Sequence, residues 1–234
     1  MISIIIPTLN EQKNISRVIS QFKHISNLEI IVADGSSDDN TVKIAKALGA
    51  KIFQNKKKEQ NIAKNRNLGA KHAKGSILVF CDADTIFKNP KEAVKKIKKV
   101  FENTEIVAGM CVIKVSPKYE TLTDKIFLKI YNKILKNSFK TKKPISSGQC
   151  QIVRKSTFDK VNGYPIINYQ EDTELFRRLI KKGRMHYFNE TIIYESPRRY
   201  RKKGYLFLGL NALYALIMRK LFQKEVVKKW DRVE

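Results

Sequence analysis

Cysteine is scarce in this 234-residue sequence, and it is not arranged for cross-linking or metal binding. The three cysteines, Cys81, Cys111 and Cys150, stand singly without a CxxC pair, so neither a disulfide framework nor a zinc site is predicted. A reducing, cytosolic setting fits this usage. The amino terminus enters the apolar run 2–6 without a basic leader or a cleavage site, so no signal peptide is predicted.

Negative charge is also scarce: 22 Asp and Glu face 47 Lys and Arg, which gives a net charge of +25. Composition leaves three explanations open, namely nucleic-acid binding, attraction to anionic lipid, and a Lys/Ile-rich composition of the kind found in heat-adapted organisms. Zinc-ligand spacing, an RNP-type aromatic strand and a recognition helix are all lacking. A basic nucleic-acid-binding protein is therefore a weak alternative.

Short apolar runs alternate with helical patterns over residues 2–81. Strands are expected at 2–6, 28–33, 51–53 and 76–81, with helices at 15–22, 41–48 and 61–73 between them. Such alternation predicts an α/β fold with a mostly parallel, doubly wound sheet, whose ligands bind outside the carboxyl ends of the strands. This geometry gathers residues 7–11, 34–37 and 82–84 at one rim.

The pattern changes after about residue 104. Strands are expected at 106–115 and 185–194, and helices at 122–135 and 205–222. We expect this second half to be built on the same sheet, without a flexible linker.

Two carboxylates, Asp82 and Asp84, follow the apolar run that ends at Cys81. In extended backbone, residues two apart face the same way, so the pair offers two hard oxygen ligands on one side. Mg²⁺ or Mn²⁺ can bind such a pair while sharing a diphosphate. The alternative is a solvated loop with two exposed acids, but the position after a buried strand favours the metal site.

Six motifs, in a fixed order over about residues 2–200, resemble family 2 glycosyltransferases of the GT-A fold. Residues 4–11 (IIIPTLNE) resemble the family's opening strand and P-x-x-N-E turn, and residues 32–41 (VADGSSDDNT) its VVDDGSTDGT segment, with Gly35 in place of the second Asp. Residues 66–69 (RNLG) match R-N-x-G, and residues 82–84 match DxD. Residues 162–164 (NGY) and 171–175 (EDTEL) resemble the G-G-[FY] and E-D-x-E-L elements.

The resemblance implies an inverting, metal-dependent transfer of sugar from a nucleoside-diphosphate sugar to an acceptor hydroxyl. It implies a GT-A, Rossmann-like, mostly parallel sheet flanked by helices. With the change of pattern near residue 104, we expect a nucleotide-sugar-binding half (1–104) and an acceptor-binding and catalytic half (105–204) of the same domain. The apolar run at 205–222 predicts a C-terminal amphipathic helical segment (205–234). A nucleotidyltransferase of similar fold is the second-ranked alternative, but residues 7–10 (PTLN) do not form its Gly-rich, basic phosphate loop.

By the same resemblance, four residues line the base and ribose pocket: Pro7, Thr8, Glu11 and Asp34. Pro7 has the alternative of only ending a strand, and Glu11 of only favouring a helix amino terminus. Arg66 either contacts the diphosphate, which we favour, or pairs with an acid. Gly148 and Gln149 occupy a place where such enzymes close the sugar pocket.

Glu171 and Asp172 precede an apolar pattern and are expected in the first turn of an amphipathic helix. Acids are favoured there whatever the function. An inverting transfer nevertheless needs a carboxylate that takes the proton of the acceptor hydroxyl. The family pattern makes Asp172 the candidate base, with Glu171 in support.

Basic residues are dense at 197–204 (PRRYRKKG), which we expect to be a loop. Arg198 and Arg199 either form a solvated face or stabilise the charge of a departing diphosphate or of a lipid phosphate.

An apolar run at 205–222, bracketed by Lys and Arg, suits a helix lying on an anionic membrane surface. The segment 122–135 adds a second apolar face, edged by Lys125, Lys129, Lys133 and Lys136. Packing on the sheet, or in a homodimer, is the alternative. The uncharged run 204–218 is shorter than the roughly 20 residues of a spanning helix. We expect a cytoplasmic protein, with peripheral binding to the inner face of the cell membrane and a lipid-linked acceptor left open.

Overall fold

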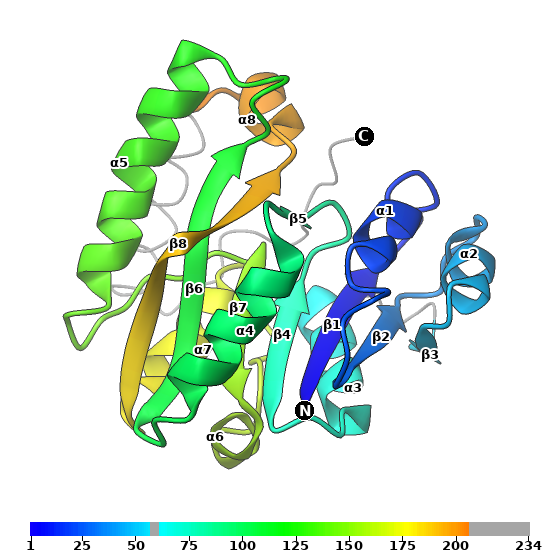
Figure 1. Cartoon of the computed structure of the whole chain (residues 1–234), viewed down its shortest axis with the longest axis horizontal. Helices are drawn as coiled ribbons and strands as arrows, with labels where there is room; N and C mark the ends of the chain where they lie inside the picture. Colours follow the sequence, from blue (N-terminus) through cyan, green and yellow to red (C-terminus); the bar gives the residue numbers. More distant parts are fainter. Residues whose placement is uncertain (57–60, 206–234) are drawn as a thin grey trace.

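One eight-stranded sheet organises the protein (Figure 1). The computed structural model describes residues 1–56 and 61–205. The strands are β1 (Ile2–Thr8), β2 (Leu28–Asp34), β3 (Lys51–Gln54), β4 (Ile77–Cys81), β5 (Ile86–Phe87), β6 (Ile106–Val115), β7 (Cys150–Arg154) and β8 (Arg184–Glu195). Their order is β3-β2-β1-β4-β7-β6-β8-β5. The α/β fold predicted from the alternating pattern is confirmed.

The sheet joins two halves through β7. Strands β3, β2, β1 and β4 are parallel to their neighbours. Strand β7 runs antiparallel to both β4 and β6, whereas β8 is parallel to β6 and antiparallel to β5. Every residue of β1 and β4 is buried, as expected for central strands covered on both faces.

Helices cover both faces of the sheet. They are α1 (Ile15–Ser20), α2 (Thr41–Ala47), α3 (Ile62–His72), α4 (Pro90–Phe101), α5 (Leu122–Ser138), α6 (Lys155–Lys160), α7 (Glu171–Leu179) and α8 (Arg198–Lys203). In Figure 1, α1 and α4 lie over one face and α3 and α7 over the other, while α5 lies at the edge beyond β8. Within residues 1–56 and 61–205, no helix is long and apolar enough to cross a bilayer.

Two local predictions need correction. Strand β1 continues through Pro7 to Thr8 rather than stopping at the proline. It pairs with β4 only as far as Ile5, so the missing N–H of Pro7 lies where β1 has a single neighbour.

The basic segment predicted as a loop forms α8 instead, because Arg201 donates to Oδ2 of the buried Asp124 at 2.6 Å and so fixes α8 on α5. The predicted helix at 205–222 lies outside the described residues, apart from its first residue.

The three cysteines lie on neighbouring strands although they are far apart in the sequence. Cys81 on β4 is opposite Cys150 on β7, and Cys150 is hydrogen bonded to Cys111 on β6. All three are free and fully buried. Burial raises the pKa of the Cys81 thiol well above its usual value, so this group behaves as a core side chain rather than a reactive thiolate.

Candidate active site

The loops after β1 and β2 are tied together at the carboxyl edge of the sheet. The N–H of Asn10 donates to Ser37 Oγ at 2.8 Å, and the N–H of Asp38 donates back to Asn10 Oδ1 at 2.8 Å. The N–H of Glu11 donates to Thr41 Oγ1 at 2.7 Å, at the start of α2. These bonds confirm that residues 7–11 and 34–37 gather at one rim.

Asp34 is the centre of this loop pair. Its carboxylate accepts from Thr8 Oγ1 at 2.9 Å, from the N–H of Ser37 at 2.8 Å and from Gln54 Nε2 at 3.1 Å, and also from the Ser37 hydroxyl. Asp34, Thr8 and Pro7 are all buried, whereas Glu11 is partly exposed. Of the four residues predicted to line the base and ribose pocket, Glu11 is thus the one open to solvent, and the shared assignment stays a prediction.

Asp82 and Asp84 lie in a turn rather than in the extended backbone that we expected. The N–H of Thr85 donates to the carbonyl of Asp82 at 3.0 Å and closes this turn. The carbonyl of Gln149 accepts from the N–H of Asp82 and from Thr85 Oγ1, both at 3.1 Å. Gln149, in the segment between α5 and β7, therefore fixes this turn through two hydrogen bonds to its carbonyl.

Negative charge is crowded at this turn. Burial raises the pKa of Asp84 to about 6, and the charges of Asp82 and Glu11 add to the effect. Burial also raises the pKa of Asp82, against the attraction of Arg66. Their side chains remain 28% and 30% exposed, for Asp82 and Asp84 respectively. Within residues 1–56 and 61–205, no group of three or more His, Cys, Asp or Glu could hold a metal ion, so the role of Asp82 and Asp84 as metal ligands stays a prediction.

Arg66 on α3 joins three parts of the site. Its side chain is 1% exposed, and Nη1 donates to Glu171 Oε1 at 2.8 Å. Nη2 donates to Asp82 Oδ1 at 2.9 Å and to the Gly148 carbonyl at 3.1 Å. The structure therefore shows Arg66 paired with acids, the second of the two alternatives, and its contact with a diphosphate stays a prediction. A Cβ on Gly148 would lie 2.8 Å from Arg66 Nη2, so any side chain at position 148 would clash with the guanidinium.

Two of the family motifs, residues 66–69 (RNLG) and 162–164 (NGY), are hydrogen bonded to each other. Asn67 Nδ2 donates to the carbonyl of Tyr164 at 2.9 Å, and the N–H of Tyr164 donates to Asn67 Oδ1 at 2.9 Å. Gly163 has a φ of +63°, and a Cβ there would lie 2.6 Å from Asn67 Oδ1. These contacts fix α3 against the segment before α7.

Asp172 and Glu171 begin α7, as the sequence predicts. Arg66 neutralises Glu171, whereas Asp172 accepts from the backbone N–H of Thr173 at 2.6 Å. Burial and the charge of Glu171 raise the pKa of Asp172 to about 7. A carboxylate with this pKa exchanges protons near neutral pH, which suits a general base.

Sequence reasoning missed Tyr131 and Glu195, which lie near the predicted residues Asp172 and Gln149. Tyr131 on α5 lies beside the Ser147 hydroxyl, and burial, with the charges of Asp172 and Glu195, raises its pKa. Gln149 Nε2 donates to Glu195 Oε2 at 2.6 Å, and the Ser147 hydroxyl donates to Gln149 Oε1. Glu195 had a usable signal, because it ends an apolar strand as Asp34 does. Tyr131 had no such sequence signal, since it stands in a helical pattern of Lys and Ile.

Arg198, at the start of α8, also lies near the aspartate turn. Its Nη2 is 3.9 Å from Asp84 Oδ2, and its Nε donates to Ser196 Oγ at 3.0 Å. The Arg198 charge lowers the pKa of Asp84 and so opposes the effect of burial. The side chain of Arg199, predicted to act with Arg198, lies outside the described part.

Comparison with known proteins identifies the chain's relatives. A family model described as glycosyl transferase family 2 matches residues 3–162. Dolichol-phosphate mannosyltransferase of Pyrococcus furiosus is 31% identical over 120 residues, which are 48% of this chain and 34% of that protein. GalNAc(5)-diNAcBac-PP-undecaprenol beta-1,3-glucosyltransferase of Campylobacter jejuni is 32% identical over 90 residues, which are 36% of this chain and 29% of that protein. The matched segment is thus about a third of the length of these relatives.

Solved structures show the same fold. A mannosyltransferase from Pyrobaculum calidifontis, in complex with GDP-Man and Mn²⁺, has a TM-score of 0.73 and 19% identity, over 95% of this chain and 64% of that chain. Glucosyl-3-phosphoglycerate synthase from Mycobacterium tuberculosis, in complex with Mn²⁺, UDP and glucosyl-3-phosphoglycerate, has a TM-score of 0.66 and 18% identity, over 94% and 79% of the two chains.

Proposed function

The chain belongs to glycosyl transferase family 2, and from this premise we propose that it transfers a sugar from a nucleoside-diphosphate sugar to an acceptor hydroxyl. The observation that carries the proposal is the bridge through Arg66, which binds Asp82 of the aspartate turn and Glu171 beside Asp172. A single buried guanidinium thereby holds a candidate cation site and a candidate base in fixed positions. An enzyme that activates a donor and an acceptor at once needs this positioning.

The donor is assigned to the first half of the sheet, residues 1–104. Asp84, with Asp82, would hold Mg²⁺ or Mn²⁺, and their crowded, partly exposed carboxylates support this assignment. Such a cation neutralises the diphosphate and stabilises its charge as it departs. Glu11 and the loops fixed by Asp34 would contact the base and ribose, and Arg198 would face the diphosphate beside Asp84.

The acceptor is assigned to residues 105–204, with Asp172 as base. In an inverting displacement, the acceptor oxygen bonds to C1 of the sugar while the bond from C1 to the diphosphate oxygen breaks. The acceptor proton passes to Asp172, and the electron pair leaves with the nucleoside diphosphate. The raised pKa of Asp172, about 7, supports the role because the group can both take the proton and release it afterwards.

A lipid-linked acceptor is the class we favour. The relatives from P. furiosus and C. jejuni carry dolichol phosphate and undecaprenol in their names. The net charge of +25 is attracted to lipid phosphates and to anionic membranes, which would bring the protein to the membrane surface.

A screen of nucleotide sugars with Mn²⁺ or Mg²⁺ tests the proposal by thermal stabilisation. A donor at 100 times its dissociation constant stabilises the folded protein by about 2.7 kcal/mol. We expect at least one nucleoside-diphosphate sugar to stabilise the wild type only with the metal present. No stabilisation by any of the common UDP, GDP or dTDP sugars would contradict the proposed function.

A further inference from the structure

Helix α5 exposes a stripe of large apolar side chains. Leu122, Ile126, Ile130 and Ile134 recur at every fourth position and are 74%, 53%, 56% and 48% exposed. They are four of the seven large hydrophobic residues that are exposed in the described part of the chain. Residues four apart lie on one side of a helix, so the four form a continuous strip, which we call the α5 stripe.

A row of cations runs beside the α5 stripe. Lys125, Lys129 and Lys133 each directly precede an isoleucine of the stripe, and all three are exposed. The one acid of the helix, Asp124, is fully buried and bonded to Thr121 and Arg201, so it does not offset this charge. Glu120, before the helix, lies 3.9 Å from Nζ of Lys125 and offsets that lysine alone. Like charges four residues apart destabilise a helix, and exposed β-branched residues are poor helix formers. The face is therefore costly for a helix that meets only water.

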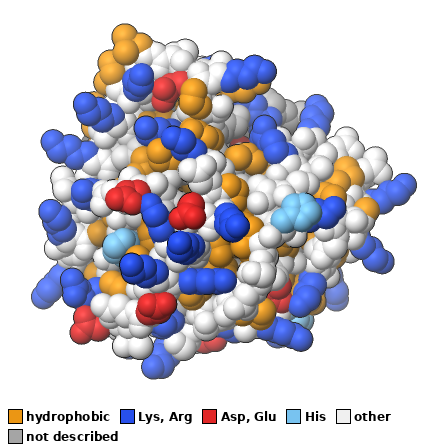
Figure 2. Space-filling view, in the orientation of Figure 1, with side chains coloured by type: hydrophobic (Ala, Val, Ile, Leu, Met, Phe, Trp, Pro, Cys, Tyr) orange, Lys and Arg blue, Asp and Glu red, His pale blue; other side chains and the backbone are white. Residues whose placement is uncertain are grey.

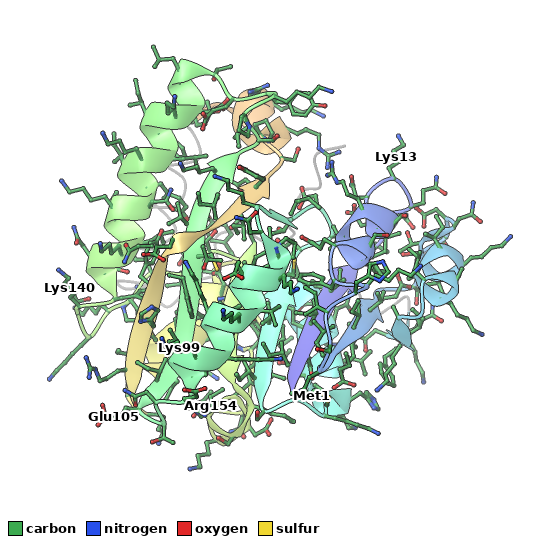
Figure 3. All side chains as sticks on the ribbon, in the orientation of Figure 1. Met1, Lys13, Lys99, Glu105, Lys140 and Arg154 are labelled. Carbon is green, nitrogen blue, oxygen red and sulfur yellow. The ribbon has the colours of Figure 1, made fainter. Side chains whose placement is uncertain are left out.

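The position of α5 gives this face access to a large partner. The helix forms one edge of the molecule, beyond β8 and far from β3 (Figure 1). Lys and Arg side chains line this edge with hydrophobic side chains between them (Figure 2). Lys140, which follows α5, projects away from the body of the protein (Figure 3).

Another side of α5 belongs to the candidate acceptor site. Tyr131 lies beside Ser147, close enough to Asp172 and Glu195 for their charges to act on it. Phe127 stacks on Tyr131, with ring centroids 6.0 Å apart, and connects this side to the stripe. A surface that covers the α5 stripe would therefore adjoin the place assigned to the acceptor.

We propose that the α5 stripe and the row Lys125, Lys129 and Lys133 dock on the headgroup region of an anionic bilayer. Apolar side chains entering the acyl boundary, flanked by lysines at the phosphates, are the arrangement of an interfacial helix. A second copy of the chain fits less well, because it would bring two lysine rows together. The inference rests on the proposed function only where it explains how a lipid-linked acceptor reaches Asp172.

Co-sedimentation of the full chain with phosphatidylglycerol vesicles at low salt tests the docking face. Replacing Lys125, Lys129 and Lys133 by Gln is expected to lower the vesicle partition coefficient about 10-fold or more, because each lysine near an anionic surface adds to binding. The matched control replaces Lys91, Lys95 and Lys99 of α4 by Gln. These lysines are also exposed and spaced by four, but α4 has no exposed large apolar residue beside them. The vesicle partition coefficient of this control should fall by no more than about 3-fold, through the change in net charge.

The apolar contribution is tested separately. Ile126→Ser with Ile130→Ser should weaken vesicle binding, whereas Ile166→Ser, which alters an isoleucine that is 54% exposed outside α5, should not. Equal losses for the α4 and α5 triple variants, or a wild type that does not pellet, would overturn the proposal.

Another occupant of the stripe would give a different result. If residues 206–234 or a second copy cover it, the double variant will unfold more easily or change its oligomeric state, with vesicle binding unchanged, and this also overturns the proposal. Stabilisation by nucleotide sugar, measured on every variant, keeps a failure of the proposed function distinct from a failure of docking.

Discussion

Two aspartates at the carboxyl edge of the same sheet differ in the donors that surround them. Asp34, which ends β2, is fully buried and accepts hydrogen bonds from Thr8, Ser37 and Gln54. Asp84, after β4, is partly exposed, and burial and neighbouring carboxylates raise its pKa to about 6. A carboxylate rich in donors holds loops together. One that lacks them keeps a charge for a cation or substrate to neutralise.

Arg66 connects Asp82, which is next but one to Asp84, with Glu171, and its loss is expected to have the largest effect on stability. Arg66→Met leaves Asp82 and Glu171 without their buried cation, so the free energy of unfolding should fall by about 3–5 kcal/mol in urea titrations. Lys96→Met, which breaks the exposed pair of Lys96 with Glu190, is the control and should change stability little. Similar losses in both variants would show that Arg66 does not hold the site together.

Asp172→Asn tests whether Asp172 is the base. The amide keeps the shape of the side chain but cannot take a proton at neutral pH. Sugar transfer at saturating donor and acceptor should slow at least about 10²-fold, while donor binding stays nearly normal. Turnover equal to that of the wild type would reject the assignment.

Asp34→Asn and Asp84→Asn sharpen the comparison directly. The first turns an amide NH₂ towards groups that themselves donate, and should lower the free energy of unfolding by about 1–3 kcal/mol. The second removes a charge that its surroundings disfavour, and should be neutral within about 0.5 kcal/mol or stabilising. Equal destabilisation by the two substitutions in urea would erase the distinction.

The pH dependence of stability tests the raised pKa of Asp172. The pKa of this group is about 7 in the folded protein against an ordinary 3.8, so the folded state binds the proton more tightly than the unfolded state. Its ionisation therefore lowers stability as pH rises from about 4 to 7, with the full cost present above pH 7. Asp172→Asn should therefore exceed the wild type in free energy of unfolding at pH 8, by a margin that shrinks to nothing as the pH falls towards 4. If the free energies of unfolding of the two proteins change in parallel with pH, the raised pKa of Asp172 is contradicted.

The sequence predicts the strands whose apolar runs are long, and it predicts the acids at their ends. Strands β1, β2, β4, β6 and β8 are where the pattern indicates, because a buried strand needs a continuous run of apolar residues. Strand β7 is missing from the prediction, since its place between β4 and β6 depends on pairing with distant residues. Helix α4 is also missing, although Pro90 at its start and its apolar face give a local signal.

The sequence predicts which residues form the candidate site better than it predicts how those residues are arranged. The local pattern places Asp82, Asp84 and Asp172, but it cannot show that Asp82 and Asp84 lie in a turn held by Gln149. It likewise leaves open whether Arg66 meets acids or substrate, because both partners come from other elements. Such contacts are set by the packing of α3, α7 and β7, which no single segment encodes.

Calorimetry on Asp84→Ala tests the central claim most directly. The nucleotide sugar found in the screen is titrated into the wild type and the variant, each with Mn²⁺ and with a chelator. Because Asp84 lies in a turn and its side chain is 30% exposed, the variant should fold normally. The account predicts that binding to the wild type weakens without Mn²⁺, and that binding to Asp84→Ala is weak and the same with and without the metal. A variant that keeps the metal requirement of the wild type would contradict it.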